Sequence, residues 1–301
     1  MLRLNPVYQK DLRTTARSLR TYVIIFAFNS LLSLFGLFAL YFTFEYQQSL
    51  GNSVQYSAIL EIYSVITGVE FFLLLLVVPA VTAGAISGEK ERQTLEILLT
   101  TKMSPGSIIR GKLLASISMM LLLAFSSLPV IALVFSIGGI TLRDLGGFLL
   151  LILETAVYLG SIGIFFSALL KKSTSATVAV YGIVLLLCLG TFGAVFGIHF
   201  LNQIHLNHLV TDGSTAMQAD IGNWMLLLLG NPIATYLSVL KGQTGTGRSL
   251  AEIYGKYGNL SAIWNDHWFL ISMIFQIVIA MLLLFWSAAL LNPLKKQPSV
   301  S

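Results

Sequence analysis

The chain has 301 residues, of which 56% are hydrophobic and only 10% are charged. An average soluble domain carries about 25% charged residues, so this composition excludes an ordinary water-soluble protein and indicates lipid as the solvent. The formal net charge of +5 does not indicate nucleic-acid binding, because the basic residues flank apolar runs, where lipid head groups meet them. The one cysteine, Cys188, lies inside an apolar run, which excludes a disulfide or a thiolate metal cluster within the chain.

Residues 1–20 predict an amphipathic helix in the membrane interface, with Asn5 as its cap and Pro6 at its first position. The basic residues that follow at spacings of three, four and three share one face of such a helix: Lys10, Arg13, Arg17 and Arg20. These cations would lie against lipid phosphates. The alternative is a basic flank that only orients the first span. The next apolar run is too long for the apolar core of a signal peptide, about 7–15 residues, so we interpret it as a retained span.

Six apolar runs are long enough to cross a membrane, which takes about 20 residues. They are Tyr22–Phe44, Ile62–Ile86, Leu113–Phe135, Leu145–Leu170, Ala176–Phe196 and Trp268–Leu291. We expect both termini in the cytoplasm, because then all Lys and Arg residues except Arg143, Lys241, Arg248 and Lys256 lie inside. The predicted fold is therefore an all-α integral membrane domain over residues 21–301, with an external region at 197–267.

The apolar segment Trp224–Leu240 complicates this topology, because a seventh span would place the C-terminus outside. The distribution of Lys and Arg does not separate the two arrangements. Pro232 removes a backbone donor and clashes with the preceding turn, and each half is then too short to span. We predict two short external or re-entrant helices here.

The loop at residues 87–112 is rich in charge at its start, and Leu95, Leu98 and Leu99 then recur at helical spacing. Arg92 can pair with Glu96 one turn later. The pattern predicts a short amphipathic helix beneath the membrane. Its apolar edge either docks another protein or packs only on its own chain, and the residues alone leave both open.

The run SGEKERQTLEILLTTKMSPGSIIRGK (residues 87–112) resembles the loop of ATP-binding-cassette type-2 exporter permeases that follows their second span. NPVYQKDLRTTARS (residues 5–18) is similar to the connecting helix before the first span of that family. Two departures concern the shape of the loop. Gln93 stands where many members have glycine, and Lys102-Met103 stand where proline is common.

The resemblance implies a coupling helix that binds a separate ATPase subunit, with the N-terminal helix beside it. The residues that would contact the ATPase are Glu89, Glu91, Arg92, Thr94, Leu95, Glu96, Leu98 and Leu99. It further implies a second permease subunit, identical or different, in a bacterial cytoplasmic membrane. The chain would have no catalytic residue or cofactor of its own, since ATP and Mg²⁺ bind the partner. An ion-coupled secondary transporter or an intramembrane enzyme remains an alternative.

Glu70 and Glu154 fall within predicted spans, in the outer half of the bilayer. Ionisable groups there are costly, so we expect them to line an outer vestibule of the translocation path or to be protonated in place. The alternative is that their spans start later and leave them at the interface. Small residues four apart predict close helix contacts at Gly163 and Ser167 and at Gly193 and Gly197.

Two further patterns are weaker. Residues 242–249 fit a phosphate-binding loop except that Arg248 replaces the lysine, and we interpret them as a polar external loop. His205 and His208 are three residues apart, but no third ligand is evident, so we predict no metal site.

Overall fold

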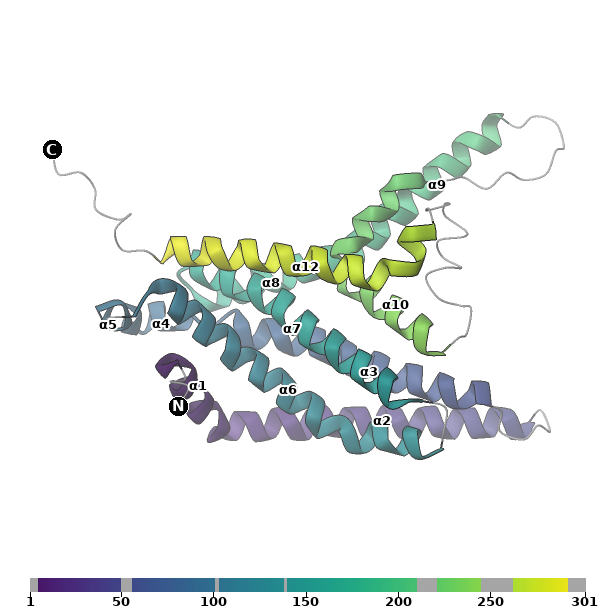
Figure 1. Cartoon of the computed structure of the whole chain (residues 1–301), viewed down its shortest axis with the longest axis horizontal. Helices are drawn as coiled ribbons and strands as arrows, with labels where there is room; N and C mark the ends of the chain where they lie inside the picture. The colour runs from purple at the N-terminus through teal and green to yellow at the C-terminus, as the bar shows by residue number, and fades with distance from the viewer. Residues whose placement is uncertain are drawn as a thin grey trace. The chain divides into compact units, whose positions relative to one another are not determined.

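The computed structural model describes residues 5–49, 56–100, 103–137, 140–209, 221–244 and 262–291, and every regular element within these ranges is a helix (Figure 1). The helices are α1 (Pro6–Ala16), α2 (Leu19–Ser49), α3 (Tyr56–Thr82), α4 (Ser87–Glu91), α5 (Thr94–Thr100), α6 (Pro105–Ile137), α7 (Leu142–Leu169), α8 (Ser173–Leu185), η1 (Leu186–Gly190), α9 (Thr191–Leu209), η2 (Gly222–Gly230), α10 (Pro232–Thr244) and α12 (Ala262–Leu290). They form two compact units, Met1–Tyr181 with Ile277–Ser301, and Gly182–Gln276.

Six helical segments are long and apolar enough to cross a membrane, which confirms the six predicted spans. They are Leu19–Ser49, Ala58–Glu91, Pro105–Ala132, Leu142–Leu169, Ser173–Leu206 and His267–Leu290. The predicted end of the fifth span was too early. Helix α9 continues past Phe196 to Leu209, so the region placed outside the membrane begins within a helix. The apolar run predicts only which residues lie in lipid. The helix continues further because polar residues also form its backbone hydrogen bonds.

Helix α7 forms the centre of the first unit. In the most apolar stretch of α7, 72% of the residues are buried, whereas in that of α2 only 17% are buried. Helix α2 therefore presents most of its surface to lipid, and α7 presents most of its surface to protein. Gly163 lets α7 approach α3 closely, because a Cβ atom there would lie 1.9 Å from Thr82 Oγ1. The helix contact predicted at Gly163 is therefore confirmed. At Gly193 and Gly197 a Cβ would have no neighbour within 4 Å among the described residues, so the contact predicted at that pair is absent there.

The second unit departs from regular α-helix at η1 and where η2 meets α10. The π-helix η1 interrupts the chain between α8 and α9, and η2 meets α10 at a bend of 100°. Asn231, fully buried at this bend, accepts a hydrogen bond from Ile233 N (2.8 Å) and donates one to the Cys188 carbonyl within η1 (3.0 Å). The two short helices predicted around Pro232 are thus confirmed. The polar break within an apolar region is stable because one buried amide serves both irregular backbones.

Candidate coupling site

Helix α1 is attached to the start of α6. Asn5 caps α1 by accepting a hydrogen bond from Val7 N (3.0 Å), and its amide donates to the Ser107 carbonyl (2.6 Å). A Cβ atom on Gly111 would lie 3.1 Å from Val7 Cβ, so glycine permits this contact. The predicted cap is confirmed, and it joins two segments that are far apart in the sequence.

The basic stripe is not carried by one helix. Helix α1 ends at Ala16, Arg17 is its C-terminal cap and Arg20 lies in the first turn of α2, so only Lys10 and Arg13 belong to α1. All four cations are exposed. The predicted end of the N-terminal helix at residue 20 is therefore wrong, because α1 ends at Ala16. The exposure of the four cations agrees with contact to lipid head groups.

The predicted coupling helix is two short helices, α4 and α5, which separate at Arg92 and Gln93. Gln93 has a φ of 57°, in the left-handed region where a residue other than glycine loses about 1–2 kcal/mol. The family's glycine at this place would adopt this conformation without that cost. The break also separates Arg92 from Glu96, and their predicted pair is absent from the ion pairs of the described residues.

Lys112 on α6 joins α1 to α4 at the end of the first unit that lies on the left of Figure 1. Its ammonium lies 2.9 Å from Asp11 Oδ2 on α1 and 2.6 Å from Glu89 Oε1 on α4. The Lys112 residue is only 7% exposed. A cleft of about 510 Å³ opens beside these ion pairs, with Lys10 and Arg92 also in its lining. Loop and connecting helix are therefore joined through a buried cation on α6.

The Glu91 side chain is exposed and is hydrogen-bonded to its own chain. Its carboxylate accepts hydrogen bonds from the Ser173 hydroxyl (2.7 Å) and the Ser173 backbone N–H (3.1 Å). The neighbouring Lys90 donates to carbonyls at the end of α7. These two residues hold α4 on its own chain.

Helix α5 has one buried and one exposed face. Leu95 is buried at 8% exposure, Leu98 and Leu99 are half-buried, and Ile97 is 68% exposed. Thr94 and Glu96 are exposed as well. Of the two interpretations that the sequence left open, packing on its own chain holds for Leu95, which was predicted to contact the ATPase. Ile97 was missed because it lies two residues from Leu95, on the opposite face of the helix.

The geometry agrees with a comparison of the whole chain. Residues 5–294 match the family described as ABC-2 family transporter protein. The chain belongs to this family. No curated protein matches it significantly. Together with the six apolar helices, the match confirms the resemblance seen in the loop and makes the chain a multi-pass membrane permease of the ABC-2 type.

The ABC-2 permease carries two carboxyl groups in the middle of its spans. Glu70 on α3 is fully buried and accepts a hydrogen bond from Ser127 Oγ on α6 (2.6 Å), and Glu154 on α7 is 4% exposed. Glu70 Oε2 and Glu154 Oε1 have no hydrogen-bond partner among the described residues. Each helix continues for more than a turn on both sides of its carboxyl group.

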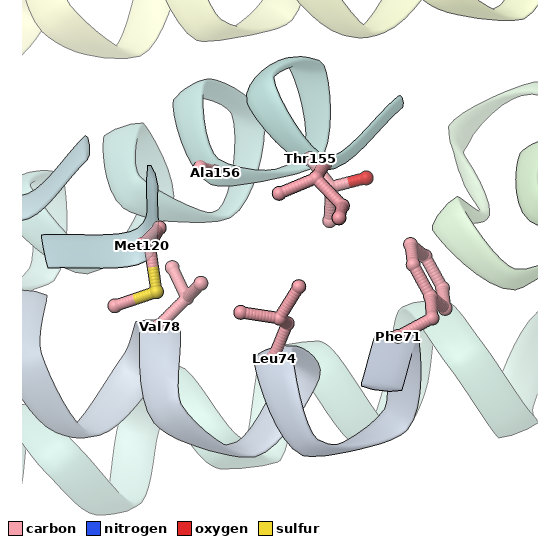
Figure 2. Close-up of a pocket in the computed structure, with 7 residues that line it drawn as sticks. Phe71, Leu74, Val78, Met120, Thr155 and Ala156 are labelled. Atoms are coloured by element: carbon pink, nitrogen blue, oxygen red, sulfur yellow. The ribbon is translucent and has the colours of Figure 1, made fainter. Parts of the chain in front are cut away.

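Neither carboxyl group lines an open vestibule in this conformation. A narrow cavity between α3, α6 and α7 is lined by Phe71, Leu74, Val78, Met120, Ile152, Thr155 and Ala156 (Figure 2). It is too narrow to admit a water molecule, and only Thr155 contributes a polar side chain. The three helices therefore pack against one another here without a gap that could hold water.

Two patterns from the sequence remain, the histidine pair and the phosphate-loop-like segment. No group of three or more His, Cys, Asp or Glu residues able to hold a metal ion occurs in the described part of the chain. His205 and His208 both lie on α9. Of the phosphate-loop-like segment, residues 242–244 complete α10 and residues 245–249 lie outside the described residues.

Proposed function

We propose that the chain is the membrane subunit of an ATP-driven exporter in the cytoplasmic membrane, with α5 docked on a separate ATPase subunit and a second permease subunit completing the path. The observation that carries this proposal is the exposed edge of α5, which follows helix α4, itself held by the Lys112–Glu89 ion pair. The termini and the loop of α4 and α5 would lie in the cytoplasm, as the distribution of Lys and Arg indicates.

The docking surface consists of Ile97 with its exposed neighbours Thr94 and Glu96. An isoleucine with 68% of its surface exposed, next to polar residues, is a small apolar contact with a polar rim. Leu95 fixes this surface by packing inward, and Lys112 holds the preceding helix α4 through Glu89. The surface is thus prepared before the partner binds, which lowers the entropy lost on docking.

Replacing Ile97 by aspartate should reduce the amount of ATPase subunit that copurifies with the tagged permease by about tenfold or more, because a charge replaces a buried apolar contact. The matched control is Leu142→Asp, which introduces the same charge at an apolar residue of similar exposure, 73%, at the start of α7. The control should retain the partner. Equal recovery of the ATPase with Ile97→Asp and wild type would refute docking through α5.

Glu70 and Glu154 are proposed to belong to the translocation path when it opens. Two observations support this proposal: each carboxyl group is buried in mid-span, and one of its oxygens has no hydrogen-bond partner among the described residues. Such burial costs free energy and, in membrane proteins, usually marks a functional site. A path that opens between α3, α6 and α7 would expose the region in which both reside.

Glu154→Gln should lower the stimulation of the complex's ATPase activity by substrate about tenfold. The reason is that the substrate would lose a hydrogen bond to a charged carboxylate, an interaction of about 1.4 kcal/mol or more. The stimulation is measured with a panel of peptides, antibiotics and lipids. Glu61→Gln is the control, since Glu61 is exposed on α3. An unchanged response of Glu154→Gln across compounds that stimulate the wild type would remove Glu154 from the path.

A further inference from the structure

Helix α4 holds the end of α7. The Lys90 ammonium donates hydrogen bonds to the carbonyl oxygens of Ala168 and Leu170, the latter at 3.2 Å, where the last turn of α7 has no intrahelical donors left. A cation at this position also interacts favourably with the negative end of the helix dipole. One side chain of α4 therefore caps the C-terminus of α7.

The next residue of α4 holds the start of α8. The Glu91 carboxylate accepts from both the backbone N–H and the hydroxyl of Ser173, the first residue of α8, at 3.1 and 2.7 Å. An anion at a helix N-terminus satisfies a free donor and interacts with the positive end of the dipole. Two consecutive residues of α4 thus bind the two helix ends on either side of one turn.

A third contact fixes α4 against rotation. Ser167 Oγ, fully buried on α7, accepts hydrogen bonds from the backbone N–H groups of Ile86 and Ser87, both at 2.9 Å. These are the amides at the N-terminus of α4, which have no partner within a helix of five residues. The start of α4 is attached to α7, and its end is attached to α7 and α8.

We propose that Lys90, Glu91 and Ser167 form a clasp through which α4 moves the turn between α7 and α8 when the ATPase subunit moves α5. The inference rests on the proposed function and adds which part of the permease moves when the ATPase moves α5. Helix α8 leaves the first unit after Tyr181 and leads into the second. The clasp therefore connects the ATPase to the chain segment that joins the two units, and Glu91 and Ser167 are positioning residues of the transport cycle.

Hydrogen–deuterium exchange of the permease–ATPase complex in lipid nanodiscs tests the clasp. The complex is compared without nucleotide and with ATP and vanadate, in peptides covering residues 87–100 and 166–180. In the wild type both segments should respond to nucleotide. In Glu91→Ala and in Ser167→Ala the response of 87–100 should persist, and the response of 166–180 should fall at least threefold.

The control and the rescue separate transmission from loss of a helix cap. Asp144→Ala removes the carboxylate of the capping box at the other end of α7, and the nucleotide response should stay as in the wild type. Glu91→Cys with Ser173→Cys, in a Cys188→Ala background, should lose the response of 166–180 and regain it when a short bis-methanethiosulfonate reagent links the two thiols. Failure of the linked protein to recover overturns the clasp.

The outcomes also separate this inference from the proposed function. If no ATPase copurifies, or nucleotide alters neither segment in the wild type, the exporter proposal fails and the clasp with it. If 87–100 responds while 166–180 does not, or if 166–180 responds fully in both alanine variants, docking stands and the clasp alone is overturned.

Discussion

Gly163→Ala is expected to lower the free energy of unfolding of the permease by about 3 kcal/mol, or to prevent its accumulation in the membrane. The added Cβ would lie 1.9 Å from Thr82 Oγ1 and 2.5 Å from Thr82 Cβ. Thr82 cannot turn away, because its Cβ is fixed by the backbone and its hydroxyl donates to the Val78 carbonyl at 2.8 Å. Helices α3 and α7 would have to separate, which loosens the buried centre of the first unit.

The loss is measured by denaturant titration in mixed micelles, with Gly146→Ala as the control on the same helix. A Cβ on Gly146 has no neighbour within 4 Å among the described residues, so that variant should equal or slightly exceed the wild type in stability. Combining Gly163→Ala with Thr82→Gly should give less damage than the sum of the single changes, because the clash is removed. A wild-type titration curve for Gly163→Ala would contradict the close approach of α3 and α7.

The spacing of Gly163 and Ser167 shows how far sequence reasoning reaches. Small residues four apart predict that backbones meet on that face, and the structure confirms it for Gly163. The spacing does not predict that Thr82 is the residue that contacts Gly163, because the packing of the whole bundle decides where two helices cross. Likewise Pro232 predicted the break between η2 and α10, whereas Asn231, which satisfies both irregular backbones there, became evident only in three dimensions.

The helical loop at residues 87–112 was predictable in its location and less so in its internal structure. The resemblance to the family marked Gln93 as unusual, which its positive φ now explains, whereas the burial of Leu95 on its own chain became evident only from the structure. Lys112 was interpreted only as one of the basic residues on the cytoplasmic side. Its two partners, Asp11 and Glu89, lie in separate segments, so no local pattern could reveal the pairing.

Lys112→Met is expected to destabilise the permease by about 3 kcal/mol, because it leaves the carboxylates of Asp11 and Glu89 without their cation. The side chains of these two residues are 21% and 17% exposed, so water replaces the lost ammonium only in part. Glu89 Oε2 already has no hydrogen-bond partner in the described part of the chain, which adds to the cost. The same change removes the link between α1 and α4. The response of hydrogen–deuterium exchange in residues 5–16 to nucleotide should therefore decrease as well.

Denaturant titration of Lys112→Met and of a triple variant, with Asp11→Asn and Glu89→Gln added, distinguishes the two contributions. Neutral amides fill the same space and carry no unpaired charge, so the triple variant should recover at least half of the lost stability. It should not recover the exchange response of α1, because no ion pair then joins α1 to α4. Stability would thus return without coupling, which is the behaviour expected if Lys112 transmits motion as well as neutralising charge. A single variant as stable as the wild type would show that these carboxylates are hydrated, and that α1 and α4 are held together by other contacts.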